Sequence, residues 1–261
     1  MPLTLEGAAL LHQMFRINWG SWRGLDAGTR AELTDEFCKT LEGMGASTGL
    51  FGMYGHKSDF MLIHFRPGFE ELSATEWEIR KLRIWQYFEP TTSYVSVVEL
   101  GLYESTGKLY GGLAAEGVAP YTEPWKTSIT DTLERQKTAM ASRLYPEIPP
   151  AKYCCFYPMD RKRGEEKNWY SLPLEQRASL MHEHGLVGRR YAGEVKQIIS
   201  GSIGMDDWEW GVDLFAEDPL VFKKLIYEMR FDPVSAIYAL FGTFYLGIRC
   251  NLERLRELLQ V

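Results

Sequence analysis

The residues whose types and spacing best suit chemistry lie between Tyr157 and Arg163. A tyrosine at the end of an apolar run is followed within six residues by three cations, Arg161, Lys162 and Arg163. Guanidinium and ammonium groups bind carboxylates and phosphates. The run therefore suggests a site that binds an anionic ligand beside a phenol, although a run of charge is more often a solvated loop.

Two histidines, His182 and His184, share a helix expected over residues 173–191. At about 100° per residue they point to opposite sides, with His182 toward solvent. The inward stripe that His184 joins consists of Leu180, Val187 and Tyr191. A core histidine is the simpler interpretation, but Gly185 and Gly188 leave room beside it for a flat group. No second histidine points inward, so a metal here needs other donors, as haem iron has.

The third candidate is Gln197, in a strand expected over residues 195–202. Side chains alternate along a strand, so Val195, Gln197 and Ile199 share one face. An amide among apolar neighbours is costly unless it finds a partner. A bond to the backbone and a bond to a ligand both satisfy that need, and the sequence leaves the two open.

Tyr157 shares its strand face with Tyr153 and Cys155, and points inward if that face is the core. A buried tyrosine often does no more than satisfy its hydroxyl. Arg143, upstream, and Arg230, in a late helix, could join the cationic run in binding an anion.

Other chemistries lack their motifs. The sequence has no phosphate-binding loop, no dinucleotide fingerprint, no nucleophile elbow and no zincin helix. None of its 4 cysteines forms a zinc spacing, so we expect reduced core cysteines. The net charge of −6 argues against non-specific binding to nucleic acid. With no secretory signal and no apolar run long enough to span a membrane, we expect a cytoplasmic protein.

The elements that must position these residues repeat one order. In the first half we expect a strand (10–19), a helix (29–44), a hairpin (49–54 and 59–66), a helix (69–88) and a strand (93–100). A linker (103–125) and a short helix (128–143) follow. The second half has a strand (153–159), the helix 173–191, a hairpin (195–202 and 208–215), helices (219–230 and 234–241), a strand (243–249) and a last helix (252–259).

The order β-α-β-β-α-β thus appears twice, which is the ferredoxin-like unit. We predict an α+β fold in which two ferredoxin-like halves form a dimeric α+β barrel. The expected division is an N-terminal half over residues 1–115, a linker with a short helix over 116–150, and a C-terminal half over 151–261.

The second half of the chain contains six further motifs: Tyr157-Pro158-Met159, Asn168-Trp169-Tyr170, His182-Glu183-His184-Gly185, Tyr191-Ala192-Gly193, Asp206 to Gly211 and Tyr227 to Asp232. Together they resemble the chlorite dismutase superfamily, and more closely its coproheme decarboxylases (haem synthases) of the Gram-positive, Firmicutes type. The resemblance covers most of the chain and is densest from Arg143 to Phe241. It implies the two-halved barrel expected above, usually as a homopentamer.

The resemblance also implies roles for the candidate residues. Its proximal haem ligand corresponds to His184, its redox-active tyrosine to Tyr157 and its distal glutamine to Gln197. The implied contacts to the propionates are Arg143, Arg161, Arg230 and Ser235. Arg161 stands where lysine is common, which keeps the charge but not the compact ammonium.

The implied reaction is the hydrogen peroxide-dependent oxidative decarboxylation of propionates 2 and 4 of Fe-coproporphyrin III (coproheme), which gives haem b. Coproheme is then both substrate and redox centre, and the coproporphyrin ferrochelatase is a possible transient partner. The alternatives are a chlorite dismutase or another haem peroxidase of this fold, or a haem carrier or sensor without activity. True chlorite dismutases have an arginine where this chain has Gln197.

Overall fold

The computed structural model describes residues 1–260, and its elements follow the doubled order. The first half consists of β1 (Thr4–Ile17), α1 (Trp19–Arg23), α2 (Ala27–Met44), β2 (Thr48–Met53), β3 (Phe60–Arg66), α3 (Phe69–Arg80) and β4 (Phe88–Gly101). Between the halves lie α4 (Tyr103–Ala115), α5 (Glu123–Ala139) and α6 (Ala141–Leu144). The second half consists of β5 (Tyr153–Arg161), α7 (Leu174–Arg189), β6 (Lys196–Gly201), β7 (Trp210–Ala216), α8 (Leu220–Met229), η4 (Val234–Tyr238), β8 (Ala239–Phe241), β9 (Tyr245–Arg249) and α9 (Leu252–Leu259).

The strands form one 9-stranded sheet in the order β7-β6-β4-β1-β3-β2-β9-β5-β8. β5 also pairs with β7, so every strand except β8 belongs to a closed barrel. The halves meet at two seams, β4 with β6 and β2 with β9. The predicted α+β barrel of two ferredoxin-like halves is confirmed.

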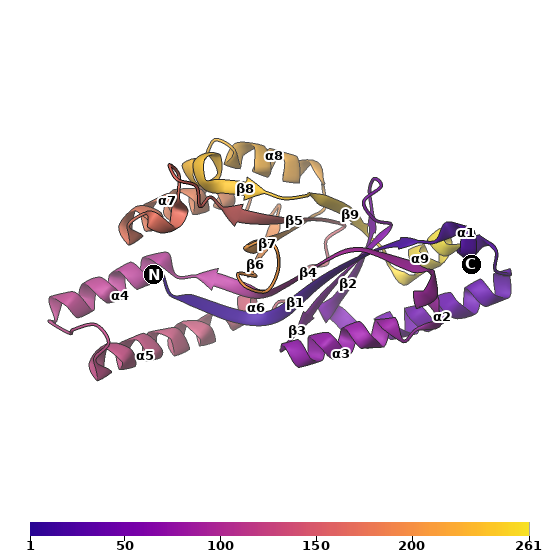
Figure 1. The fold of residues 1–261 in the computed structure, drawn as a ribbon, viewed down its shortest axis with the longest axis horizontal. Helices are drawn as coiled ribbons and strands as arrows, with labels where there is room; N and C mark the ends of the chain where they lie inside the picture. Colours follow the sequence, from indigo (N-terminus) through magenta and orange to yellow (C-terminus); the bar gives the residue numbers. More distant parts are fainter. Residues whose placement is uncertain (261) are drawn as a thin grey trace.

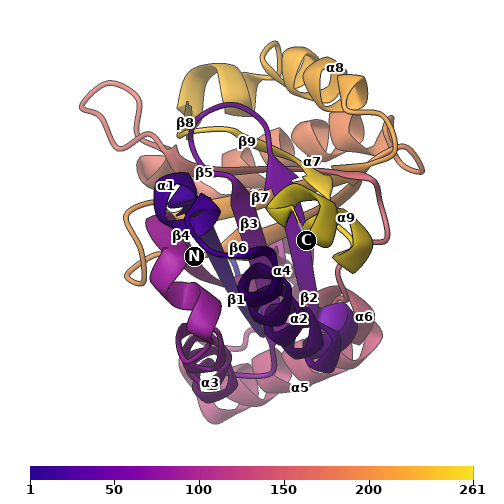
Figure 2. The same ribbon diagram turned by 90° about the vertical axis from the view of Figure 1, so that its right-hand side faces the viewer.

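Alternation along the strands divides the buried residues into three layers. One apolar cluster fills the barrel, and includes Leu10, Met61 and Phe156. A second lies between the first half's sheet and helices α1, α2 and α9, and a third between the second half's strands and helices α7 and α8. Figures 1 and 2 show α7 and α8 on the opposite side of the barrel from α2 and α3.

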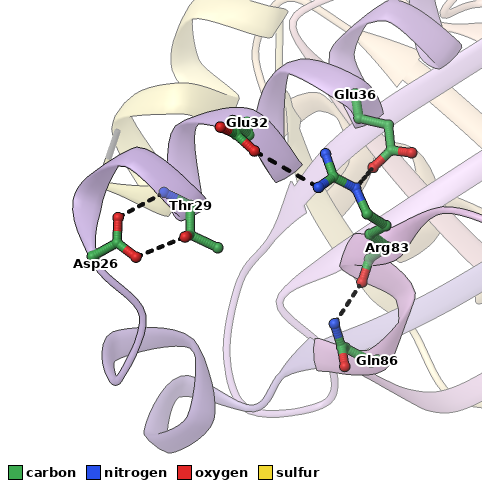
Figure 3. A network of polar contacts seen from close by, with 6 residues as sticks. All are labelled: Asp26, Thr29, Glu32, Glu36, Arg83 and Gln86. Atoms are coloured by element: carbon green, nitrogen blue, oxygen red, sulfur yellow. Dashed lines mark hydrogen bonds and ion pairs between the residues drawn. The ribbon is translucent and has the colours of Figure 1, made fainter.

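Polar contacts fix helix α2 on the first half (Figure 3). Asp26 caps the helix, accepting from the Thr29 backbone N–H at 3.0 Å and the Thr29 hydroxyl at 2.7 Å. Arg83, beyond α3, reaches Glu36 at 3.1 Å and Glu32 at 3.7 Å on the exposed side of α2. Such exposed pairs contribute little stability but restrict how the two segments sit.

The linker predicted over residues 103–125 is wrong, because α4 occupies 103–115 and α5 begins at Glu123. α4 forms despite three glycines, since it packs against α7 and its buried Thr106 hydroxyl accepts from the Leu3 backbone N–H at 2.9 Å. Tertiary contact here outweighs the low helix propensity of glycine.

Some boundaries also differ from those predicted. The helix predicted over 69–88 ends at Arg80, and Phe88 already pairs with Ile17 as the start of β4. Residues 234–241, predicted as a helix, form the one-turn π-helix η4 and then β8, which pairs with the end of β5. Within residues 1–260, no helix is both long and apolar enough to cross a membrane.

Candidate functional site

β5 carries Tyr157 on the outside of the barrel, beneath α7 and α8. Its neighbour Phe156 points into the barrel, because side chains alternate. Tyr157 is 3% exposed, and its ring stacks on Phe244 with centroids 4.5 Å apart, close to Phe241 at 5.7 Å. Burial raises the pKa of the Tyr157 phenol, so this side chain stays protonated at neutral pH.

Gln197 lies on the same face of the sheet as Tyr157. Val212 of β7 pairs with both Tyr157 and Ile199, and Leu214 pairs with both Cys155 and Gln197. Gln197 is therefore two strands and one row away from Tyr157, roughly 12 Å between Cα atoms from standard sheet spacings. The side chain is half-buried, so its amide is open to a ligand on this face.

His184 faces the site from α7 and is held by one contact. Its Nδ1 lies 2.7 Å from Asp232 Oδ2, and the side chain is 18% exposed. Among residues 1–260, Nε2 has no hydrogen-bonding partner, so it is available as a ligand. His182 is exposed, as the helical spacing predicts.

Asp232 belongs to the candidate site but was not among the residues predicted from the sequence. It is 6% exposed, and the same Oδ2 that meets His184 accepts from the Ser235 backbone N–H at 3.1 Å. A carboxylate that binds the second nitrogen of a ligating histidine fixes the ring and raises its basicity. The available signal was its position at the end of the motif Tyr227 to Asp232, but nothing in the sequence pairs it with His184.

Arg161 is a half-buried cation without an anion. Its Cζ lies 5.0 Å from the centre of the Trp169 ring, and Nη2 lies 3.7 Å from Met181 Sδ. Nη1 is buried and has no partner among the described residues. Burial lowers the pKa of this guanidinium, which still remains charged near neutral pH. A buried N–H without an acceptor is costly, and an incoming anion would remove that cost.

The other predicted cations differ in position. The Arg230 guanidinium stacks on Phe241, 3.8 Å from the ring centre, and its charge acts on Tyr157. Arg143 lies in α6, which packs on β1 and β4, and its exposed side chain makes no ion pair within residues 1–260. The structure thus brings Arg161 and Arg230 to Tyr157, and Ser235 to His184, while the role of Arg143 stays a prediction.

Arg163 and Lys162, in the cationic run, are placed by contacts of their own. Arg163 Nε lies 3.3 Å from Glu209 Oε1. The Lys162 backbone N–H donates to the Tyr238 carbonyl at 2.7 Å, and its carbonyl accepts from the Trp169 backbone N–H at 2.9 Å. These contacts fold the run back against the second half.

The site offers one histidine rather than a cluster of metal ligands. Within residues 1–260, no group of three or more His, Cys, Asp or Glu side chains could hold a metal ion. An iron bound by His184 would take its other donors from a porphyrin, which suits a site with one free imidazole nitrogen and an unpaired, half-buried cation. The chain is thus an α+β barrel whose candidate site lies between the outer face of the sheet and helices α7 and α8. This site contains a single histidine, His184, that could bind a metal.

The family model described as "Chlorite dismutase" matches residues 30–250, and the chain belongs to this family. A similar solved structure is a heme-binding protein from Thermus thermophilus, 38% identical, with a TM-score of 0.82, covering 100% of this chain and 98% of that one. A chlorite dismutase variant from Candidatus Nitrospira defluvii has 17% identity and a TM-score of 0.73 over 98% of this chain and 97% of that one. A second variant of that enzyme has 19% identity and a TM-score of 0.72 over 99% of this chain and 98% of that one.

Proposed function

We propose that this protein converts coproheme to haem b by peroxide-dependent oxidative decarboxylation of propionates 2 and 4. The observation that carries the proposal is Arg161, a half-buried and unpaired cation on the same strand and the same face as the buried phenol of Tyr157, on which its charge acts. A porphyrin carboxylate bound at Arg161 would lie on the face of β5 that carries Tyr157, a group suited to one-electron chemistry. The description of the 38% identical relative as heme-binding supports the class of ligand.

The position of each residue suggests its role in this reaction. His184 Nε2 would hold the iron, with Asp232 fixing the ring. Arg161 and Arg230 would offset part of the charge of the four propionates, which are ionised at neutral pH. Gln197, on the sheet face with Tyr157, would donate its amide to peroxide or to a propionate. The bound iron porphyrin supplies the oxidising power when peroxide is added.

Tyr157 would relay the electron. In each round a propionate loses two electrons, a proton and carbon dioxide to become a vinyl group, while one hydrogen peroxide gains two electrons and two protons to become two waters. Tyr157 gives up its phenolic hydrogen atom, becomes a tyrosyl radical, and recovers the hydrogen from the propionate side chain. Its stacking on Phe244 and its burial keep that radical away from water.

Chlorite dismutation is the rival reaction of this fold. Gln197 stands where the resemblance places an arginine in those enzymes, and its neutral amide cannot stabilise an anion as a cation does. Adding chlorite to the haem-loaded protein should release no oxygen. A pure haem carrier would bind the porphyrin and leave it unchanged after peroxide.

The test is mass spectrometry of the bound porphyrin during a peroxide titration. We expect two successive mass losses, each equal to carbon dioxide plus two hydrogens, and a final mass equal to haem b. An unchanged porphyrin, or one degraded without vinyl formation, would remove the proposal. A homopentameric assembly and contact with the coproporphyrin ferrochelatase remain predictions from the resemblance, and a cytoplasmic location remains a prediction from the sequence.

A further inference from the structure

Arg161 lies near two buried carboxylates and pairs with neither. The charges of Asp232 and Glu209 both act on the Arg161 guanidinium, as do the phenols of Tyr103 and Tyr170. An arginine that is shielded from solvent beside a carboxylate frequently forms a bidentate pair with it. Here Nη1 stays without a partner among residues 1–260, so both carboxylates must be held elsewhere.

Asp232 is occupied by His184 and Ser235, as described above. Glu209 is occupied by a different set of donors. Its Oε2 accepts from the Arg161 backbone N–H at 2.9 Å and from the Tyr170 hydroxyl at 2.8 Å, and its Oε1 lies 3.3 Å from Arg163 Nε. Glu209 therefore holds the main chain of Arg161 and not its side chain.

The geometry of β5 explains this choice. The N–H of a strand residue lies in the plane of the sheet, whereas its side chain stands nearly perpendicular to it. The Glu209 backbone N–H donates to Asp160 Oδ1 at 2.8 Å, which fixes Glu209 beside the strand edge. Glu209 is 7% exposed, so its carboxylate is largely shielded from solvent and bound by protein groups.

We propose that Glu209 is a positioning residue that holds the end of β5 so that the Arg161 guanidinium is presented, unpaired, to a carboxylate of the porphyrin. This inference rests on the proposed function only in that the ligand is a porphyrin with free carboxylates. It does not require decarboxylation.

The test is selectivity for carboxylates, measured by Soret titration with iron coproporphyrin III and with its tetramethyl ester. The readout is the ratio of the ester's Kd to the acid's Kd. We expect Arg161→Ala to lower this ratio about tenfold, as for loss of a charge-assisted hydrogen bond, and Glu209→Ala to lower it about fivefold. The double variant should fall little below Arg161→Ala alone, because both changes remove one interaction.

Lys167→Gln is the matched control, because it removes an exposed cation of the loop that follows β5 whose side chain makes no ion pair within residues 1–260, and its ratio should stay within about twofold of the wild type. A Glu209→Ala variant that weakens acid and ester equally would overturn the inference, as would full additivity with Arg161→Ala. Should Glu209→Ala not fold, Glu209→Asp, which keeps the charge but is one methylene shorter, should lower the ratio in the same sense, and an unchanged ratio contradicts the inference. A protein that passes these tests but forms no vinyl groups would refute the proposed reaction alone.

Discussion

The imidazole of His184 depends on Asp232 for its orientation. The contact at 2.7 Å joins residues that are 48 positions apart, and the carboxylate is itself fixed by the Ser235 backbone N–H. At the scale of single residues, the orientation of His184 therefore depends on a residue distant in the chain as well as on its own place in α7. Replacing Asp232 should therefore change how His184 binds a metal.

We expect Asp232→Asn to weaken binding of iron coproporphyrin by about tenfold or more, within the range found when a partner of a metal-bound histidine is replaced. Binding of the iron-free porphyrin should change little, because the carboxylate acts through the His184–iron bond. Soret titrations with both porphyrins measure the two effects. Equal weakening of both would show that Asp232 supports the fold rather than the ligand.

Single residues were predictable where local pattern decides. The helical stripe predicted the inward His184 and the exposed His182, and alternation predicted that Gln197 and Ile199 share a face. The contacts between residues distant in the chain were not predictable. Asp232 with His184 and Glu209 with Arg161 join segments distant in the chain, and no spacing rule connects them.

At the scale of elements, the doubled β-α-β-β-α-β order was predictable because each half has its own hydrophobic periodicity. The predicted secondary structure was wrong where tertiary packing outweighed the local amino-acid composition. The glycines of α4 predicted a loop, and residues 234–241 became a π-turn and a strand because β8 pairs with β5. Local sequence does not contain these tertiary contacts.

The layer between β3 and the first half's helices contains a buried histidine whose protonation should affect folding. Burial, with smaller contributions from Arg66 and His12, lowers the pKa of His64 from 6.5 to about 3. The unfolded chain binds this proton below pH 6.5 and the folded chain does not. The contribution of the neutral His64 side chain to the free energy of unfolding is therefore fully present above pH 6.5. It decreases as the pH falls toward about 3, by at most about 1.4 kcal/mol per pH unit.

Urea unfolding of the porphyrin-free protein at about pH 7.5 and about pH 5.5 measures this loss. The His64→Gln variant should show a smaller decrease between these conditions than the wild type. His56→Gln, a change at an exposed histidine, should show the wild-type decrease. Identical pH dependence in His64→Gln and the wild type would contradict the account.

At the scale of the whole molecule, the barrel is closed by side chains as well as by strand pairing. His12 of β1 and Asp213 of β7 are fully buried, and Nε2 lies 2.8 Å from Oδ1 across the interior. His12 also stacks on Phe156, with ring centroids 3.8 Å apart. This pair links the N-terminal half to the strands that carry the site on their outer face.

We expect His12→Leu or Asp213→Leu alone to lower the free energy of unfolding by about 1–3 kcal/mol, because each leaves a buried polar group without its partner. The double variant should recover much of this loss, since no such group then remains. Urea unfolding of the wild type, the two single variants and the double variant gives the double-mutant cycle that measures the coupling between the two side chains. Single variants within about 1 kcal/mol of the wild type would contradict a linking role for the pair.

The central claim is that Tyr157 relays the electron that turns a propionate into a vinyl group. The most direct measurement compares wild type, Tyr157→Phe and the matched control Tyr153→Phe, each loaded with coproheme and titrated with hydrogen peroxide, by mass spectrometry of the porphyrin. We predict that all three bind coproheme, that the wild type and Tyr153→Phe form haem b, and that Tyr157→Phe forms it more than about tenfold more slowly or not at all. Haem b formation by Tyr157→Phe at the wild-type rate would contradict the account.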